Sequence, residues 1–122
     1  MPLVRINLSN SYSPEQRQVI GDVIYDAMVE IASAPKDDKF LIFTGHADGE
    51  LVFPQTAFMG MNYTAKIVFI QVFWVAGRKT DVKKLFYRKI ADELHEKLGV
   101  RREDVWINLI DSAREDWSFG NG

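Results

Sequence analysis

The stretch Ile67-Val68-Phe69-Ile70-Gln71-Val72-Phe73-Trp74-Val75 decides the fold, because only Gln71 interrupts its run of apolar residues. A strand that is apolar at both alternating positions is buried on both of its faces. We therefore expect residues 67–75 to belong to a sheet that is covered on both sides. The chain has 122 residues, 47% of them hydrophobic, which is typical of one domain spanning 1–122.

An internal repeat surrounds this strand. At an offset of 66 residues, which aligns Asp38 with Asp104, each half has a strand, a turn, a helix, an acidic loop and a second strand. The apolar pairs that match at this offset are Val19 and Leu85, Ile20 and Phe86, Ile24 and Ile90, Met28 and Leu94, and Ala32 and Leu98. The expected elements are strands at 3–8, 40–43, 67–75 and 105–110, with helices at 14–32 and 81–98. The two β-α-β repeats thus run over about 2–43 and 67–110, joined by an inter-repeat loop at 44–66.

The repeat predicts the architecture. Two β-α-β units imply parallel strand pairs with their helices on one face of the sheet. We expect an α/β (α+β) fold with a four-stranded mixed sheet and two helices on one face. Because two helices cover only one face, a second copy of the chain is the economical cover for the other face, and we expect an oligomer.

Sequence signals mark the ends of both helices. Ser13 is a good N-cap, Pro14 suits the first helical position, and Gln16 completes the spacing of a capping box. Thr80 or a neighbour is expected to cap the second helix. Gly99 suits the left-handed conformation that ends a helix.

Pro2 is the first candidate for chemistry. A small residue after the initiator Met1 normally allows its removal, which would leave the nitrogen of Pro2 as a free secondary amine. An α-amino group has a pKa of roughly 7.7–8.0 in a model peptide, and burial in an apolar pocket lowers such a pKa. A rigid amine at the start of a strand can therefore act as a general base or a general acid near neutral pH.

Composition excludes several other functions. The net charge of −2 and the pI of about 5.6 give no sign of a nucleic-acid surface. The absence of cysteine excludes thiolate chemistry and favours a cytoplasmic setting. Two histidines, His46 and His95, are too few for a typical zinc site, so we expect no metal. The longest apolar stretch is too short for a membrane span, so we expect no membrane partner.

Three sequence features resemble the tautomerase superfamily, in the branch around malonate semialdehyde decarboxylase. They are the run from Val72 to Thr80 followed by Lys83 and Phe86-Tyr87, the ending Asp116-Trp117-Ser118-Phe119-Gly120-Asn121-Gly122, and His46 with Gly49-Glu50 between the repeats. Pro2, the duplicated β-α-β unit and the lack of cysteine also match this superfamily. The resemblance covers nearly the whole chain and implies a cofactor-independent homotrimer acting on a small carboxylate substrate.

The resemblance also implies roles for particular residues. Pro2 would be the catalytic amine, and Arg78 would hold the substrate carboxylate with its planar guanidinium. Asp38 would orient a water molecule or a substrate proton, with Asp37 as the alternative at the neighbouring position. Trp117 and Phe119 would be apolar walls of the pocket near Pro2.

One departure from the resemblance changes the expected reaction. The decarboxylase pattern has two arginines flanking one residue, whereas here Ala76 replaces the first and only Arg78 remains. The related cis-3-chloroacrylic acid dehalogenase also uses two arginines, and Val75 stands at the position of its second one. Losing one charged hydrogen bond to a carboxylate costs roughly 1.5–3 kcal/mol. This favours keto-enol tautomerisation of a 2-keto or enol carboxylic acid. Malonate semialdehyde decarboxylase or hydratase activity, and a catalytically silent trimeric binding protein, remain the alternatives.

Overall fold

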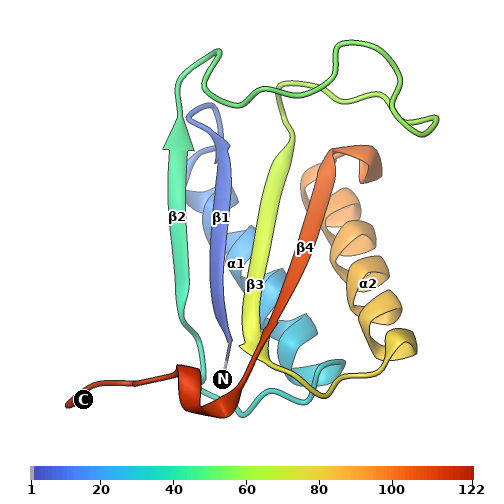
Figure 1. The fold of residues 1–122 in the computed structure, drawn as a ribbon. Helices are drawn as coiled ribbons and strands as arrows, with labels where there is room; N and C mark the ends of the chain where they lie inside the picture. The colour runs from blue at the N-terminus through green and yellow to red at the C-terminus, as the bar shows by residue number, and fades with distance from the viewer. Residues whose placement is uncertain (1) are drawn as a thin grey trace.

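The computed structural model describes residues 2–122, and its elements follow the order expected from the repeat. Figure 1 shows four strands and two long helices. Their bounds are β1 Leu3–Ser9, α1 Pro14–Glu30, β2 Leu41–His46, β3 Val68–Val75, α2 Thr80–Leu98 and β4 Val105–Ser112. Short 3-10 turns flank β4 at Arg102–Asp104 and Arg114–Asp116.

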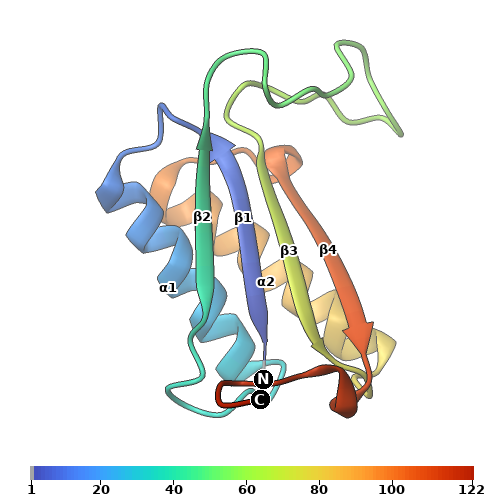
Figure 2. The ribbon, with the colours of Figure 1, turned by 60° about the vertical axis from the view of Figure 1, so that its left-hand side comes forward.

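The sheet is mixed, as the sequence predicts. Its strand order is β2-β1-β3-β4, with parallel outer pairs and an antiparallel central pair of β1 and β3. Both helices lie against the same face of the sheet (Figures 1 and 2). The fold class and the position of the two helices are therefore confirmed.

The element ends differ from the expected ones by a few residues. Helix α1 ends at Glu30 rather than at 32, while β2 continues to His46 and β4 to Ser112. The extension of β2 follows from its partner, because β1 continues to pair with it as far as Ser9 opposite His46. Polar residues such as Thr44 are held in the strand by this backbone ladder, and the inter-repeat loop is correspondingly shorter.

The core lies between the helices and the sheet. In β3, Val68, Ile70, Val72 and Trp74 are fully buried, while the side chains between them stay half-buried. The helix residues that match across the repeat fill the same layer: Ile20 and Phe86, Ile24 and Ile90, and Met28 and Leu94 are all buried. The rings of Trp74 and Phe86 meet at a tilt, with centroids 5.3 Å apart. One face of the sheet thus provides the core of the chain.

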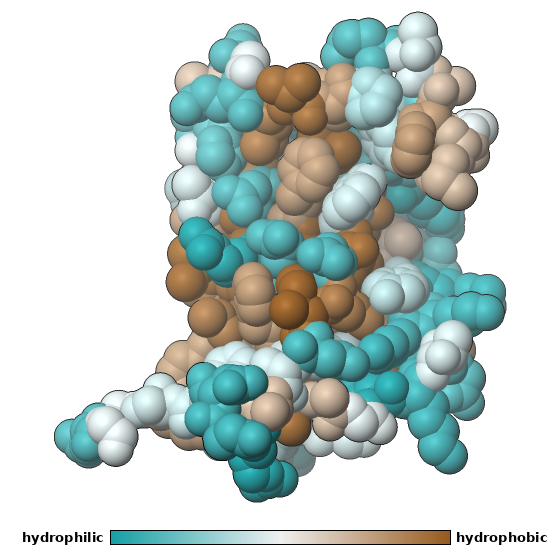
Figure 3. All heavy atoms as spheres, viewed as in Figure 1, coloured by the Kyte–Doolittle hydropathy of each residue, from teal (hydrophilic) through white to brown (hydrophobic). Residues whose placement is uncertain are grey.

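The other face of the sheet is open in the single chain. Its rows of side chains cross the strands at Leu3 with Phe73, at Arg5 with Gln71, and at Asn7 with Phe69. Figure 3 looks onto this face. It shows apolar side chains above and below a band of polar side chains that crosses the sheet. This open surface is consistent with the expectation that a second copy of the chain covers this face.

The helix ends follow the sequence signals closely. Ser13 and Gln16 form the expected capping box, with the Ser13 hydroxyl accepting from the Gln16 N–H at 3.1 Å. Helix α2 begins at Thr80, so its N-cap is Lys79, which makes no side-chain capping bond. Gly99 ends α2 with φ at 68°, a left-handed conformation that glycine adopts without steric cost.

Replacing Phe86 with Ala should lower the free energy of unfolding by about 3–5 kcal/mol, because the change removes a fully buried ring and leaves a cavity beneath Trp74. Urea denaturation at fixed protein concentration measures this loss. The matched control is Tyr87→Ala, which removes a neighbouring ring that is 37% exposed and should therefore cost less than the loss of Phe86. Equal losses in the two variants would contradict this description of the core.

Candidate active site

A pocket of about 230 Å³ lies at the end of the sheet where β1 begins. Figure 2 shows that the start of β1, the C-terminal segment and the connection between α1 and β2 lie together at this end, and residues from all three line the pocket. The lining residues are Pro2, Leu3, Asp38, Phe40, Trp117, Ser118 and Phe119. Four of the five residues expected at the site are therefore brought together: Pro2, Asp38, Trp117 and Phe119.

The backbone distinguishes Asp38 from Asp37. Asp37 adopts a left-handed conformation with φ at 68°, it is exposed, and its N–H donates to the hydroxyl of Tyr25 at 2.9 Å. The next residue, Asp38, is half-buried and lines the pocket. Of the two acids that the sequence left open, Asp38 is thus the one beside Pro2.

A chain of hydrogen bonds holds the aromatic wall in place. The indole N–H of Trp117 donates to the Ser112 hydroxyl at 2.7 Å, and that hydroxyl donates to the carbonyl of Trp74 at 3.0 Å. The rings of Trp117 and Phe119 stack with centroids 5.8 Å apart and planes at 19°. The segment after β4 is therefore fixed to the end of β3, and it presents a flat apolar surface to the pocket.

Arg78 does not line this pocket but lies at the same end of the sheet. Its Nε donates to the carbonyl of Ala32 at 2.9 Å, and its Nη1 donates to the carbonyl of Val75 at 3.0 Å. The guanidinium carbon sits 4.2 Å from the centre of the Trp74 ring. The ladder between β1 and β3 ends with Leu3 opposite Phe73, and these two residues are the chain neighbours of Pro2 and Trp74. Trp74 thus contacts the arginine at the end of the sheet where β1 begins.

The guanidinium stays charged in this setting. Burial lowers the pKa of Arg78 below its ordinary value, and the nearby Asp111 carboxylate acts in the opposite direction. An arginine begins from a pKa so high that it remains protonated near neutral pH. The arrangement can therefore supply a fixed positive charge beside an apolar pocket.

Asp111 is a residue of this site that the sequence reasoning missed. Its carboxylate accepts from the indole N–H of Trp74 at 2.7 Å and from the ammonium of Lys83 at 3.0 Å. Asp111 and Trp74 are opposite each other in the pairing of β3 with β4. Only the strand register could have revealed this contact. Asp111 fixes the orientation of the ring on which Arg78 rests.

Among residues 2–122, no group of three or more histidine, cysteine, aspartate or glutamate side chains could hold a metal ion. Over the same residues, no helix is long and apolar enough to cross a membrane. The expectation that the chain works without a cofactor stays a prediction.

Family models and known proteins match this chain. A family model described as a tautomerase enzyme matches residues 38–120, and a second model of the same description matches residues 2–55. The probable tautomerase YusQ of Bacillus subtilis (strain 168) is 36% identical over all of this chain and 95% of its own length. The probable tautomerase YrdN of the same strain is 28% identical over all of this chain and 93% of its own length.

Solved structures of other proteins are also similar to this chain. The FG41 malonate semialdehyde decarboxylase inhibited by 3-bromopropiolate is 37% identical, with a TM-score of 0.90 over 98% of this chain and 90% of its own. A fused 4-OT described as a symmetric trimer shares the fold, with a TM-score of 0.81 at 21% identity over 98% of this chain and 93% of its own. The chain belongs to the tautomerase family, as the sequence resemblance implied.

Replacing Asp111 with Asn should lower stability in a pH-dependent way. The hydrogen bond from Lys83 holds the pKa of Asp111 below its ordinary value, against partial desolvation. A depressed folded-state pKa gives stability that is present above the unfolded pKa of about 3.9 and is lost as the pH falls through the folded pKa. The deficit of the variant, roughly 1 kcal/mol or less for such an exposed pair, should therefore be full at pH 7 and fade in acid.

Chemical denaturation at a series of pH values measures this deficit. The control is Glu96→Gln, which neutralises an exposed carboxylate on α2 away from Trp74. A deficit for Asp111→Asn that stays constant down to pH 2 would show that the carboxylate charge does not stabilise this end of the sheet.

Proposed function

We propose that this protein catalyses keto-enol tautomerisation of a 2-keto or enol carboxylic acid, with Pro2 as the general acid and base. One observation carries the proposal: Pro2 is buried at the wall of an apolar pocket that also contains Asp38. Membership of the tautomerase family supports the reaction class. The reaction moves one proton and needs neither an oxidant nor a second substrate.

The proton transfer balances within the substrate. The neutral amine of Pro2, exposed once Met1 is removed, accepts a proton from the enol hydroxyl as the electron pair forms the carbonyl. The protonated amine then gives this proton to the carbon that accepts the electrons of the double bond. Apolar walls such as Trp117 and Phe119 favour the neutral amine, because desolvation disfavours the charged form. Asp38 orients the hydroxyl or a water molecule at the reacting end.

Arg78 is the proposed anchor for the substrate carboxylate. A guanidinium has five N–H groups, and two of those on Arg78 donate hydrogen bonds to the carbonyls of Ala32 and Val75. The remaining N–H groups, on Nη1 and Nη2, are enough to hold both oxygens of a carboxylate end-on. The backbone bonds and the Trp74 ring keep the fork fixed before the substrate arrives.

A homotrimer is the assembly that we propose for this enzyme. The open face of the sheet carries large apolar side chains, among them Trp106 and Ile42, which remain 44% and 45% exposed in the single chain. Burial of such side chains is the main driving force for association. Structural neighbours described as trimers support this assembly.

Decarboxylation of malonate semialdehyde is the second candidate function. The observation in its favour is the 37% identity to FG41 malonate semialdehyde decarboxylase, which extends over 98% of this chain. In that reaction a protonated Pro2 would polarise the aldehyde carbonyl while the carboxylate leaves as carbon dioxide. The single arginine favours tautomerisation, because one guanidinium suits a substrate whose carboxylate stays intact.

Replacing Pro2 with Ala should lower kcat/KM for ketonisation of phenylenolpyruvate by at least about a hundredfold, the usual scale of general acid-base catalysis. The physical reason is that a primary amine on a freely rotating residue loses the fixed position of the proline nitrogen. Ultraviolet absorbance follows the reaction, and intact mass first confirms that Met1 is absent from both proteins.

Protein that retains Met1 provides a second test of the same nitrogen. An amide cannot accept the proton, so this form should also be inactive while keeping its fold by circular dichroism. Full activity of either form would rule out Pro2 as the base. If native Pro2 protein ketonises no faster than buffer but releases carbon dioxide from malonate semialdehyde, the second candidate function replaces the first.

Exchanging Asp38 for Asn should lower kcat by about tenfold or more, because the amide lacks the negative charge with which the carboxylate orients the hydroxyl or the water molecule. The matched control is Asp37→Asn, which alters the exposed neighbour outside the pocket lining and should leave kcat within about twofold. Steady-state kinetics of both variants measure the difference. Equal effects, or a larger loss at Asp37, would contradict the assignment of Asp38.

A further inference from the structure

The aromatic wall of the candidate active site is attached to the sheet through Trp117. Among the described residues 113–122, only Trp117 is half-buried, and the others are exposed. The N–H groups of Ala113 and Asp116 bond within this segment. The hydrogen bond that joins the segment to the strands runs from the Trp117 indole N–H to the Ser112 hydroxyl at 2.7 Å. The position of the whole segment therefore depends on the contact between these two side chains.

The Ser112 hydroxyl is fully used at this position. Its hydrogen goes to the carbonyl of Trp74 at 3.0 Å, which leaves a lone pair for the indole of Trp117. The backbone of Ser112 is held independently, because it pairs with Val75 and its carbonyl accepts from the N–H of Ala76 at 2.9 Å. The hydroxyl thus connects a rigid strand end to an exposed segment.

Phe119 depends on the same contact. Its ring is 62% exposed and stacks on the ring of Trp117. Without the Ser112 hydroxyl, the half-buried indole N–H would lose its acceptor, which is costly for a group that is partly removed from water. Both aromatic walls of the pocket would then be released, and water would reach Pro2.

The internal repeat indicates that the fold does not require this contact. At the offset of 66 residues Ser112 matches His46, and an equivalent backbone bond closes that strand end, from the N–H of Asn10 to the carbonyl of His46 at 2.8 Å. The residue that matches Trp117 is Leu51, whose side chain has no N–H group. The opposite end of the sheet thus keeps the backbone bond without the aromatic attachment.

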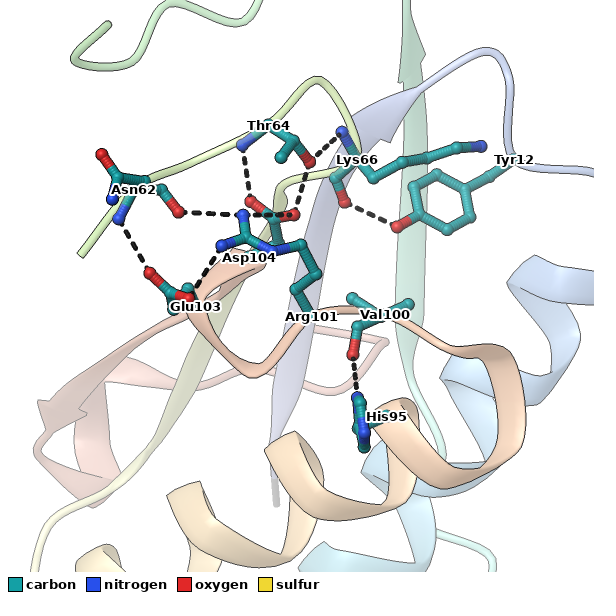
Figure 4. A network of polar contacts seen from close by, with 9 residues as sticks. All are labelled: Tyr12, Asn62, Thr64, Lys66, His95, Val100, Arg101, Glu103 and Asp104. Atoms are coloured by element: carbon teal, nitrogen blue, oxygen red, sulfur yellow. Dashed lines mark hydrogen bonds and ion pairs between the residues drawn. The ribbon is translucent and has the colours of Figure 1, made fainter. Parts of the chain in front are cut away.

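The matching carboxylates differ in the same way. Asp104, which matches Asp38, is fully buried and accepts from the N–H and the hydroxyl of Thr64. Figure 4 shows this carboxylate enclosed by Thr64 and Arg101. That end of the sheet holds its acid in a closed polar network, whereas Asp38 lines a pocket with aromatic walls. The bond that holds the aromatic wall therefore serves the site rather than the fold.

We propose that Ser112 is a positioning residue of the active site, whose hydroxyl holds Trp117 against the pocket and so keeps water from the Pro2 amine. This inference rests on the proposed function, in which Pro2 acts as the base. The neutral amine is the form that accepts the proton, and desolvation favours it over the charged form. Ser112 acts through the aromatic wall, since it is not among the residues that line the pocket.

The charges around the pocket stay the same when the hydroxyl is removed. Asp38 is the charged residue among those that line the pocket, and its carboxylate favours the protonated amine. Arg78, at the same end of the sheet, has the opposite effect. The other charged residues of the segments that meet here are exposed; they are Lys36, Asp37, Lys39, Lys79, Arg114, Glu115 and Asp116. A change in the pKa of the amine on loss of the hydroxyl therefore reports the wall and not a charge.

The pKa of the Pro2 amine measures this effect directly. The native oligomer, with the loss of Met1 confirmed by intact mass, is labelled with 15N-proline, and the resonance of the amine nitrogen is followed against pH. In Ser112→Ala this pKa should rise by about 0.5 or more, because water reaches the amine. Below the native pKa, kcat/KM for ketonisation of phenylenolpyruvate should fall by about threefold or more, and the deficit should shrink well above it.

Three further variants isolate the contact. Ser112→Thr keeps the hydroxyl and should keep the native pKa of the amine. Trp117→Phe keeps an aromatic ring but removes the N–H, so it should reproduce the rise, and combining it with Ser112→Ala should add little because both remove one bond. The matched control is Ser9→Ala, since Ser9 ends β1 at the opposite end of the sheet and its hydroxyl bonds locally to Ser11.

Three outcomes would overturn the proposal. One is an unchanged amine pKa in Ser112→Ala, as expected if another copy of the chain holds the wall. Another is a rise that Trp117→Phe does not reproduce, which would show an effect through the carbonyl of Trp74. The third is an equal rise in Ser9→Ala. The titration reads the amine without turnover, so a native protein that ketonises no faster than buffer would refute the proposed function and leave this test intact.

Discussion

The antiparallel pairing of β1 with β3 is the contact on which the rest of the structure depends. It joins the two β-α-β repeats back to back, with Arg5 opposite Gln71 at its centre. Each parallel outer pair needs only its own repeat, but the mixed sheet exists because the repeats meet along this ladder. The ladder ends with Leu3 opposite Phe73, the chain neighbours of Pro2 and Trp74. A slip of one residue would turn the buried side chains of β3 to the open face and would separate the amine position from its neighbours.

Trp74 connects the hydrophobic core to the residues around the candidate active site. Its ring packs on Phe86 in the core, its indole N–H is held by Asp111, and its outer side supports the guanidinium of Arg78. Its carbonyl also accepts from Ser112, which in turn holds Trp117. One core residue thus positions groups from the second helix, from β4 and from the C-terminal segment. Rigidity at the pocket comes from the hydrophobic core rather than from the loops around it.

The sequence predicts the parts of this molecule that depend on local patterns. Helical period and the capping box of Ser13 place α1, and the repeat offset places the matching α2. The sequence could not decide whether Asp37 or Asp38 lines the pocket. The answer depends on the left-handed backbone of Asp37, which no sequence pattern requires. Asp111 was missed for a different reason: its partnership with Trp74 is a property of strand register. The placement of Arg78 beside the pocket rather than in its wall likewise follows from two backbone carbonyls.

The pocket beside Pro2 is built from the first and the last parts of the described chain, and this has a consequence for the order of synthesis. Trp117 and Phe119 follow Pro2 in the sequence, so the ribosome adds them after it. Until then the proline nitrogen, once Met1 is removed, is an ordinary solvated amine with no apolar wall. The pocket around Pro2 therefore cannot be complete until residues up to Phe119 have been synthesised.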